Sequence, residues 1–486
     1  VAQICRGLEG MPLAIELVAA LMDVLVAGQI AERLDRALGL LRSGSREAIP
    51  RHQTLRATLS WSFELLGEPE QSLFGRLSVF AGGFSLEAVE AVGEGEGIER
   101  SDVLESLLML VDKSLVVAGP TGDRGARYRL LEPVRQYARE RLEQSGEADA
   151  FRRRHAEFFL GLAEEAAAEL TGAHQQEWAK RLEAEHDNMR AALSWSLENE
   201  PETTLRLAGA LARLWEMRAR FLEGSAWFEA ALRQSGRAEA PSDAAARAKI
   251  LSEAGTFAWH RGDYEYAIVL HGEALELYRE LGDDGGVAFA ILCLGTQYLD
   301  KGDLERSAPF FEEALATSRR IGERRTIAMA IRNLAEVARQ KGEYERAKTL
   351  GMECLSLYQE LGDDLRVART VGWMGLLTFW SGDDQNLAEG FLKEGLALNR
   401  EIESWDYVAY CLEGFAGLAG ERGQGARAAQ LWGGRRRSCA LISVLPPRPK
   451  PGRTTSPAWP PHAPGSARRR GKRCGRRGVR CRRKKP

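Results

Sequence analysis

The chain has 486 residues, of which 44% are hydrophobic and 28% charged, and its formal net charge is −2. This length exceeds one domain, so two to four are expected, with the composition of an ordinary globular protein. Residues 433–486 hold 18 of the 67 basic residues and no acidic residue, which leaves 49 basic against 69 acidic residues elsewhere. That acidic balance disfavours nucleic acid as a partner, except through the basic tail.

The seven cysteines form no CxxC pair, which predicts a reducing, cytoplasmic environment without disulfides or a zinc site. We expect no secretory signal at the start of the chain. The stretch from Gly10 to Gly28 is apolar, but it contains Glu16 and Asp23. We therefore expect a buried helix there and no contact with a membrane.

Residues 1–50 are helical in pattern and contain Gly10, Met11, Pro12 and Leu13. Proline suits the first turn of a helix, where its missing N–H would have no partner. On its own this motif indicates no more than the start of a core helix.

The following segments are more specific in combination. Residues 51–62, 73–84, 110–116 and 128–138 read RHQTLRATLSWS, LFGRLSVFAGGF, LVDKSLV and YRLLEPVRQYA. In this order they resemble bacterial regulatory ATPases of the STAND class, the NB-ARC-related relatives of LuxR-type and antibiotic-regulator proteins. The resemblance covers residues 1 to about 433.

The resemblance implies that Gly10, Met11, Pro12 and Leu13 belong to the GLPL segment of a helical subdomain, residues 1–50. They would lie on the adenine side of a nucleotide held by a core that this chain lacks. A full-length parent would bind ATP or ADP with Mg²⁺, and this chain alone would hold no cofactor. Leu131 stands where the family often has a phosphate-sensing histidine, so sensing there is in doubt.

Residues 51–147 are expected to form a winged-helix domain. Three helical stretches precede two short β-prone runs, 114–117 and 127–130, on either side of a Gly/Pro/Asp turn. Such a pair predicts the hairpin called the wing. A winged helix can read DNA through its major groove. The resemblance implies instead a lid that closes over a nucleotide, and the acidic balance favours the lid.

Residues 148–245 are predicted to form a helical linker with a degenerate repeat near residues 221–232. His155 and His186 have no partner cluster, so no metal site is expected.

Residues 246–433 show a fixed period. Gly262, Gly302, Gly342 and Gly382 are forty residues apart, and Gly423 follows after forty-one. Such a period is typical of stacked helical hairpins, and the pattern resembles tetratricopeptide repeats. The glycines are predicted to end one helix of each pair in the left-handed conformation, and the acidic residues that follow are predicted to cap the next.

A second column of small residues keeps the same period: Gly255, Gly295, Ala335 and Gly375. Small side chains at these positions are predicted to let paired helices approach closely. The fold class expected is therefore mostly α, with a winged-helix domain followed by a solenoid.

Residues 434–486 break the pattern. We expect either the product of a shifted reading frame or a disordered basic tail that contacts nucleic acid or acidic surfaces.

The sequence lacks the chemistry of an ATPase. Gly471-Lys472 has neither the spacing nor the preceding strand of a phosphate loop. We expect no enzyme activity in this chain, which resembles the carboxy-terminal part of a larger ATPase switch. The expected function is sensing and scaffolding, with a protein, peptide or small effector in the repeat groove and self-association as an output. A free-standing repeat adaptor and a DNA-binding regulator are the alternatives.

Overall fold

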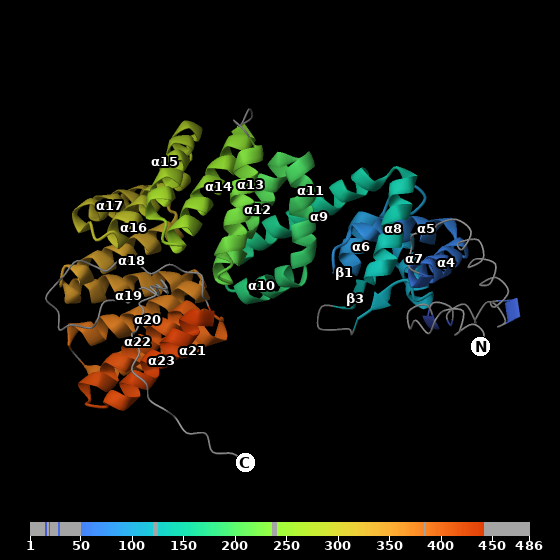
Figure 1. The fold of residues 1–486 in the computed structure, drawn as a ribbon. Helices are drawn as coiled ribbons and strands as arrows, with labels where there is room; N and C mark the ends of the chain where they lie inside the picture. Colours follow the sequence, from blue (N-terminus) through green and yellow to red (C-terminus); the bar gives the residue numbers. More distant parts are fainter. Residues whose placement is uncertain are drawn as a thin grey trace, which may run out of the picture.

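A computed structural model describes residues 50–119, 125–235, 241–382 and 384–441, with a few isolated residues before Pro50. Figure 1 shows a small amino-terminal lobe, a central group of helices and a curved array of helical pairs. The predicted fold class is confirmed. Within the described residues, no helix has the length and apolar character needed to cross a membrane.

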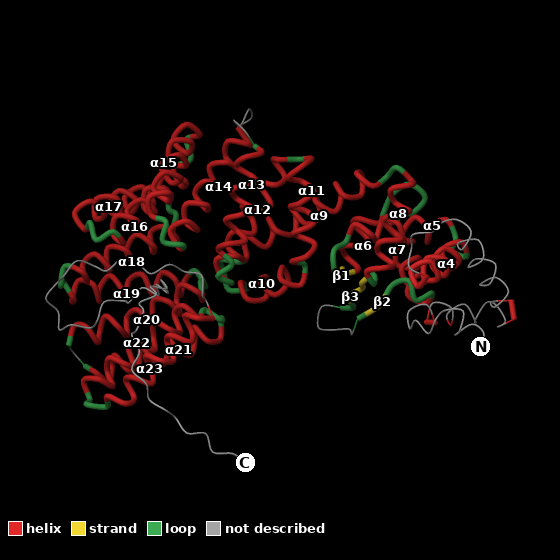
Figure 2. The backbone as a smooth tube through the Cα atoms, viewed as in Figure 1, coloured by secondary structure: helices red, strands yellow, loops and turns green. Residues whose placement is uncertain are grey.

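The amino-terminal lobe is a winged helix. Its elements are α4 (Pro50–Glu64), α5 (Glu68–Arg76), the 3-10 helix η2 (Leu77–Val79), β1 (Gly83–Ser85), α6 (Leu86–Gly93), α7 (Arg100–Asp112), β2 (Val117–Ala118), β3 (Arg127–Arg129) and α8 (Glu132–Ser145). The predicted hairpin is confirmed, because β2 and β3 pair antiparallel with Val117 opposite Arg129. The sequence did not reveal β1, which joins β3 on its other side to give the order β1-β3-β2 (Figure 2).

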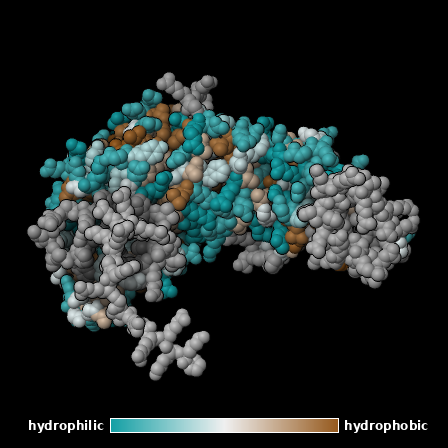
Figure 3. Space-filling model, viewed as in Figure 1, coloured by the Kyte–Doolittle hydropathy of each residue, from teal (hydrophilic) through white to brown (hydrophobic). Residues whose placement is uncertain are grey.

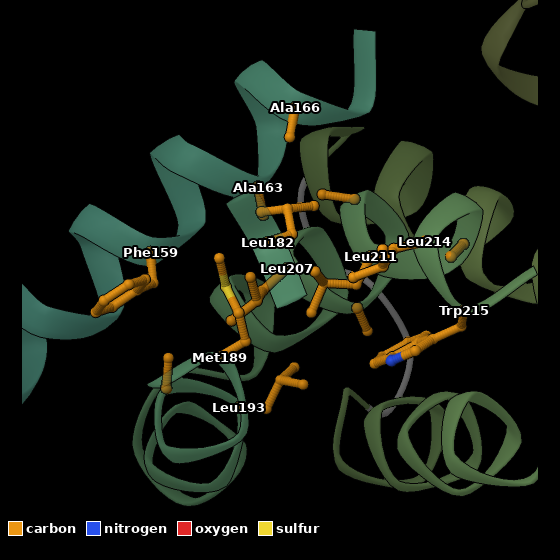
Figure 4. Packing of buried hydrophobic residues seen from close by; sticks show 14 of the residues in the cluster. Phe159, Ala163, Ala166, Leu182, Met189, Leu193, Leu207, Leu211, Leu214 and Trp215 are labelled. Carbon is orange, nitrogen blue, oxygen red and sulfur yellow. The ribbon is translucent and has the colours of Figure 1, made fainter. Parts of the chain in front are cut away.

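The central group consists of α9 (Ala148–Glu169), α10 (Gln175–Ala184), α11 (His186–Asn199), α12 (Pro201–Met217) and α13 (Phe221–Gln234). Figure 4 shows how α9 places Phe159, Ala163 and Ala166 beside side chains of α10, α11 and α12. Helix α10 ends at Ala184 and α11 begins at His186, so the apolar residues on the two sides of Glu185 lie on two separate helices.

The winged helix is fixed to the central helices by Asn188, whose side chain is 1% exposed. Its amide oxygen accepts a hydrogen bond from the Ala81 backbone N–H (2.8 Å), and its amide nitrogen donates to the Gly83 carbonyl (2.8 Å). Arg127 of β3 donates to the same carbonyl and forms an ion pair with Glu185. Buried polar groups satisfied in this way hold two units in one relative orientation.

The repeat array runs from α14 to α23. Its helices are α14 (Pro241–His260), α15 (Tyr264–Leu281), α16 (Asp284–Asp300), α17 (Leu304–Ile321), α18 (Arg324–Gln340), α19 (Tyr344–Glu360), α20 (Asp364–Ser381), α21 (Gln385–Glu401), α22 (Trp405–Glu421) and α23 (Gly425–Leu441). Helix α23 continues eight residues past 433, so the expected basic tail begins as a helix.

The predicted glycine turns are confirmed, since Gly262, Gly302, Gly342, Gly382 and Gly423 all have φ between 71° and 83°. The predicted caps are confirmed in part: Asp263 and Asp303 accept a hydrogen bond from the first turn of the next helix, whereas Glu343 does not. In the forty-one-residue repeat the cap is Asp384, one residue later than the period would place it.

The small residues at the forty-residue period lie where paired helices pack closely, as predicted. A Cβ added at Gly295 would lie 2.8 Å from Cε1 of Phe311, and one at Gly255 would lie 2.6 Å from the His271 ring. At Gly255 and Gly295 the paired helices therefore lie so close that the packing leaves no room for a Cβ.

We predict that Gly295→Ala lowers the free energy of unfolding by about 1–3 kcal/mol, because the new methyl group must displace a packed phenylalanine. The matched control is Gly272→Ala in α15, where nothing lies within 4 Å of the added Cβ. That change is expected to be neutral or stabilising by about 0.5–1 kcal/mol. Urea unfolding measures both, and equal effects would contradict the close-packing account.

Candidate ligand site at the axis of the repeat array

Helix α12 of the central group meets the start of α20 in the repeat array at a cluster of charged side chains. Arg213 and Glu216 come from α12, and Asp363, Arg366 and Arg369 come from the start of α20, about 150 residues later. Gln175, just after the α9–α10 turn, also donates to the Gly362 carbonyl (3.4 Å). The central helices α10 and α12 therefore contact the α19–α20 turn of the array.

Two carboxylates organise the cluster. Asp363, which is 1% exposed, lies 3.1 Å from Arg213 Nη2 and 3.2 Å from Arg325 Nη2 of α18. Glu216 lies 2.7 Å from Arg213 Nη1, 3.6 Å from Arg366 and 3.5 Å from Arg369. We call these six residues the axial cluster. Its ion pairs join four arginines to two carboxylates, which leaves an excess of two positive charges.

Local structure explains the position of Asp363. Gly362 has φ 66° and turns the chain after α19, and Asp363 then caps α20 by accepting from the Arg366 backbone N–H (3.1 Å). Arg366 and Arg369 follow at helical spacing on the face of α20 that meets α12.

The pKa values reflect this crowding. Burial alone would raise the pKa of Glu216, but Arg213, Arg366 and Arg369 outweigh it and hold that pKa well below its usual range. Burial and the neighbouring Arg213 lower the pKa of Arg325 to about 10. Burial raises the pKa of Glu253, on α14, to about 7, with Lys249 opposing the shift and Glu216 adding to it.

A hollow adjoins the axial cluster at the ends of α12 and α14 and the starts of α20 and α22. Its lining is Glu216, Met217, Arg218, Ala219, Phe221, His260, Arg369, Glu403, Ser404 and Trp405. Ala219 (φ 52°) and Glu403 (φ 58°) are two of the three non-glycine residues with positive φ in the described chain. Such strained residues concentrate at functional sites.

The face of α7 is the second candidate surface, because the corresponding helix of DNA-binding winged helices enters the major groove. Its exposed residues between positions 101 and 112 are Ser101, Asp102, Leu104, Glu105, Leu108, Met109 and Asp112. Leu104, Leu108 and Met109 are 40%, 52% and 40% exposed. This face therefore presents carboxylates and apolar side chains, with cations only at its ends, at Arg100 and Lys113.

Gly10, Met11, Pro12 and Leu13, which the sequence suggested as nucleotide-binding residues, lie outside the described residues. His155 and the cysteines of the described chain are part of the packed interior. His155 is buried against Phe80 and Phe159, and burial lowers its pKa to about 4. No group of potential ligands in the described chain could hold a metal ion. Cys293, Cys354 and Cys411 are free and buried.

Sequence reasoning missed the axial cluster, although one signal was present. Gly282, Gly322 and Gly362 form a second series of period forty, each followed by an acidic residue, and all three have positive φ. This series marks the starts of the inner helices. The curvature of the whole array decides which of these helices begins next to α12. No local sequence pattern encodes that curvature.

We predict a pH-dependent effect for Glu253→Gln. The folded-state pKa of about 7 lies above the ordinary value of 4.5, so the wild type loses stability as pH rises from about 4.5 to 7, where this carboxyl ionises. The variant should be more stable than wild type by about 1–3 kcal/mol at pH 8 and nearly equal to it at pH 5.

Urea unfolding at the two pH values measures this difference. The control is Glu276→Gln on α15, whose side chain is exposed, and it should show no such pH dependence. A Glu253→Gln effect that is the same at pH 5 and pH 8 would contradict the assignment.

Two segments of the chain match known families. Residues 66–143 match the family described as winged helix-turn-helix domain, and residues 286–360 match tetratricopeptide repeat. The sheet and the glycine-ended helical pairs agree with these matches.

Longer similarities are to mycobacterial proteins. The "Putative HTH-type transcriptional regulator Rv0890c" of Mycobacterium tuberculosis is 42% identical over 300 residues, which are 61% of this chain and 34% of that protein. The "Uncharacterized protein Rv0894" of the same organism is 48% identical over 151 residues, 31% of this chain and 38% of that protein. The chain thus spans about a third of the length of these curated relatives.

Among solved structures, a STAND protein with a tetratricopeptide repeat sensor from Pyrococcus horikoshii is 15% identical, with a TM-score of 0.39, over 85% of this chain and 74% of that one. A likeness at this level supports no functional argument. The chain combines a winged-helix domain with tetratricopeptide repeats and is homologous to proteins named as HTH-type transcriptional regulators.

Proposed function

We propose that this chain is the sensor and scaffold portion of a STAND-type transcriptional regulator. In this proposal the repeats bind a protein, peptide or small effector, and the winged helix acts as a switch lid that contacts protein. The motif segments within residues 51–138 and the name of the mycobacterial relative support a regulatory role.

The observation that carries the lid assignment is the exposed face of α7. DNA binding requires cations that neutralise phosphates, and each phosphate contact depends on such a charge. The α7 face instead offers Asp102, Glu105 and Asp112 around Leu104, Leu108 and Met109. An apolar surface rimmed by carboxylates is typical of a protein-binding site.

The winged helix would transmit movement to the repeats because it is joined rigidly to the central helices that precede them. Asn188 and Arg127 bind both the winged-helix sheet and the central helices, and α9 continues from the winged helix into the central core. A change in the curvature of the array would therefore shift the α7 face with it.

The chain's own residues do not fit a nucleotide. Its sequence has no phosphate loop, so Gly10, Met11, Pro12 and Leu13 would contribute to nucleotide binding only beside a separate core. A gene sequence with a phosphate-loop motif within about 250 codons upstream of Val1 would support the STAND assignment over a free-standing adaptor.

We predict that a chain ending at Leu441 shows no salt-dependent binding to duplex DNA, because the exposed face of α7 repels phosphates. The full chain is expected to bind weakly through its basic tail, with an affinity that falls steeply as salt rises. Fluorescence anisotropy between about 50 and 200 mM salt measures both. Binding of the shortened chain with a clear salt slope would favour the DNA-binding alternative.

A further inference from the structure

Positive charge is concentrated on two successive inner helices of an otherwise acidic molecule. Residues 1–432 contain 49 basic and 69 acidic residues. Within them, α18 has four arginines and one glutamate, and α20 has two arginines and one aspartate. A local excess of cations on an acidic protein attracts anionic partners to that part of its surface.

The cations of α18 lie on one accessible stripe of the helix. Its partly exposed members recur at steps of three and four residues: Arg325, Met329, Arg332, Glu336 and Arg339. Arg325 contacts Asp363 of the axial cluster at 3.2 Å, so the stripe starts at that cluster. With a helical rise of about 1.5 Å per residue, Arg332 and Arg339 lie about 10 and 20 Å farther along α18.

These two arginines lie over tryptophan rings of α20. The guanidinium carbon of Arg332 is 3.9 Å from the ring centroid of Trp373, and that of Arg339 is 4.5 Å from the ring centroid of Trp380. Trp373 is 1% exposed, and its Nε1 donates a hydrogen bond to Glu336 (2.8 Å). Stacking on an aromatic ring positions a guanidinium group without using its N–H donors.

Several of these N–H donors remain available. Arg332 makes no hydrogen bond within the described residues, since the Glu336 carboxylate oxygen lies 3.9 Å from it. Arg339 binds the same carboxylate through Nε and Nη2, which leaves its Nη1. The two arginine side chains are 20% and 21% exposed, so a partner in solution can reach them. One carboxylate between two arginines leaves a cation for an external anion.

The covered tryptophans decide between the classes of anionic partner. Single-stranded nucleic acid binds through aromatic rings on which its bases stack. In this surface the Trp373 ring is buried, and an arginine lies over each of the two indoles. A peptide carboxylate needs only the N–H groups at the edge of a guanidinium, which match its two oxygens. The surface therefore favours an acidic peptide.

The spacing of the arginines indicates the spacing of the carboxylates. Arg332 and Arg339 are seven residues apart, which is about 10.5 Å along the axis of α18. A peptide in the polyproline II conformation rises about 3.1 Å per residue with three residues per turn. Side chains three positions apart then face the same side, about 9.3 Å from each other. Acidic residues at every third position can therefore meet both arginines.

We propose that Arg332 and Arg339 of α18 form a docking surface for an extended acidic peptide whose carboxylates are three residues apart. The proposal rests on the effector-binding function proposed above for the repeats and gives the chemical class of the effector. The peptide lies along α18, and each of its two carboxylates accepts hydrogen bonds from one arginine.

The test is isothermal titration calorimetry on the full chain with two end-blocked peptides of equal composition, Gly-Glu-Pro-Pro-Glu-Gly and Gly-Pro-Glu-Glu-Pro-Gly. The first should bind about tenfold more tightly, because only its glutamates reach both arginines. The basic residues 433–486 should bind the two peptides equally, so the difference reports on α18. Equal affinities for the two peptides would overturn the proposal.

Variants locate the binding. Arg332→Gln should weaken the first peptide about tenfold, since it removes a charged donor. Circular dichroism checks that this variant is folded. The matched control is Arg306→Gln on α17, because Arg306 also lies over an aromatic ring, that of Tyr298 (5.8 Å), but is not part of the α18 stripe. The control variant should bind the peptide as the wild type does.

Wild-type affinity in a folded Arg332→Gln chain would show that the peptide does not dock on α18. Oligothymidine that binds more tightly than the peptide and weakens with Arg332→Gln would assign the surface to nucleic acid, which also contradicts the proposal. If Arg332→Gln does not fold, the two peptides on the wild type decide the question. None of these results affects the duplex DNA measurement on α7, so failure of the peptide site and failure of the lid assignment can be told apart.

Discussion

The contact between α12 and the start of α20 is the constraint on which the architecture depends. Arg213 reaches Asp363 across 150 residues of chain and binds Glu216 with its other nitrogen. Its ion pairs join α12 to α20 directly and, through Asp363, to Arg325 of α18. Without it the charged side chains of the cluster would be more exposed to water, where such ion pairs contribute little.

The local features of the array could be predicted from the sequence because each depends on a single position. Positions 262 and 302 have a left-handed backbone conformation, which favours glycine. Positions 255 and 295 need glycine because the side chains of His271 and Phe311 leave no room for a Cβ. The β2–β3 hairpin was equally predictable. Strand β1 was not, because three residues give no alternation, and the strand exists only through its pairing with β3.

The axial cluster could not be predicted for a different reason. Arg366 and Arg369 look like solvated charges of a helix, and only the accumulated curvature of several repeats places them against Glu216. The same holds for Asn188, an ordinary polar residue in sequence that becomes the buried link between winged helix and array. Figure 3 shows a largely hydrophilic outer surface, with hydrophobic patches at the upper left. The buried ion pairs of the axial cluster therefore cannot be inferred from the composition of the chain.

The most direct measurement of the central claim is the coupling free energy between Arg213 and Asp363, from urea unfolding of the wild type, Arg213→Gln, Asp363→Asn and the double variant. Residues in one ion-pair network couple by about 0.5–3 kcal/mol, whereas distant sites add within about 0.3–0.5 kcal/mol. The observed Arg213–Asp363 contact predicts a stabilising coupling of about 1–3 kcal/mol. Additive effects of the two substitutions would show that α12 and the start of α20 do not interact and would contradict the account.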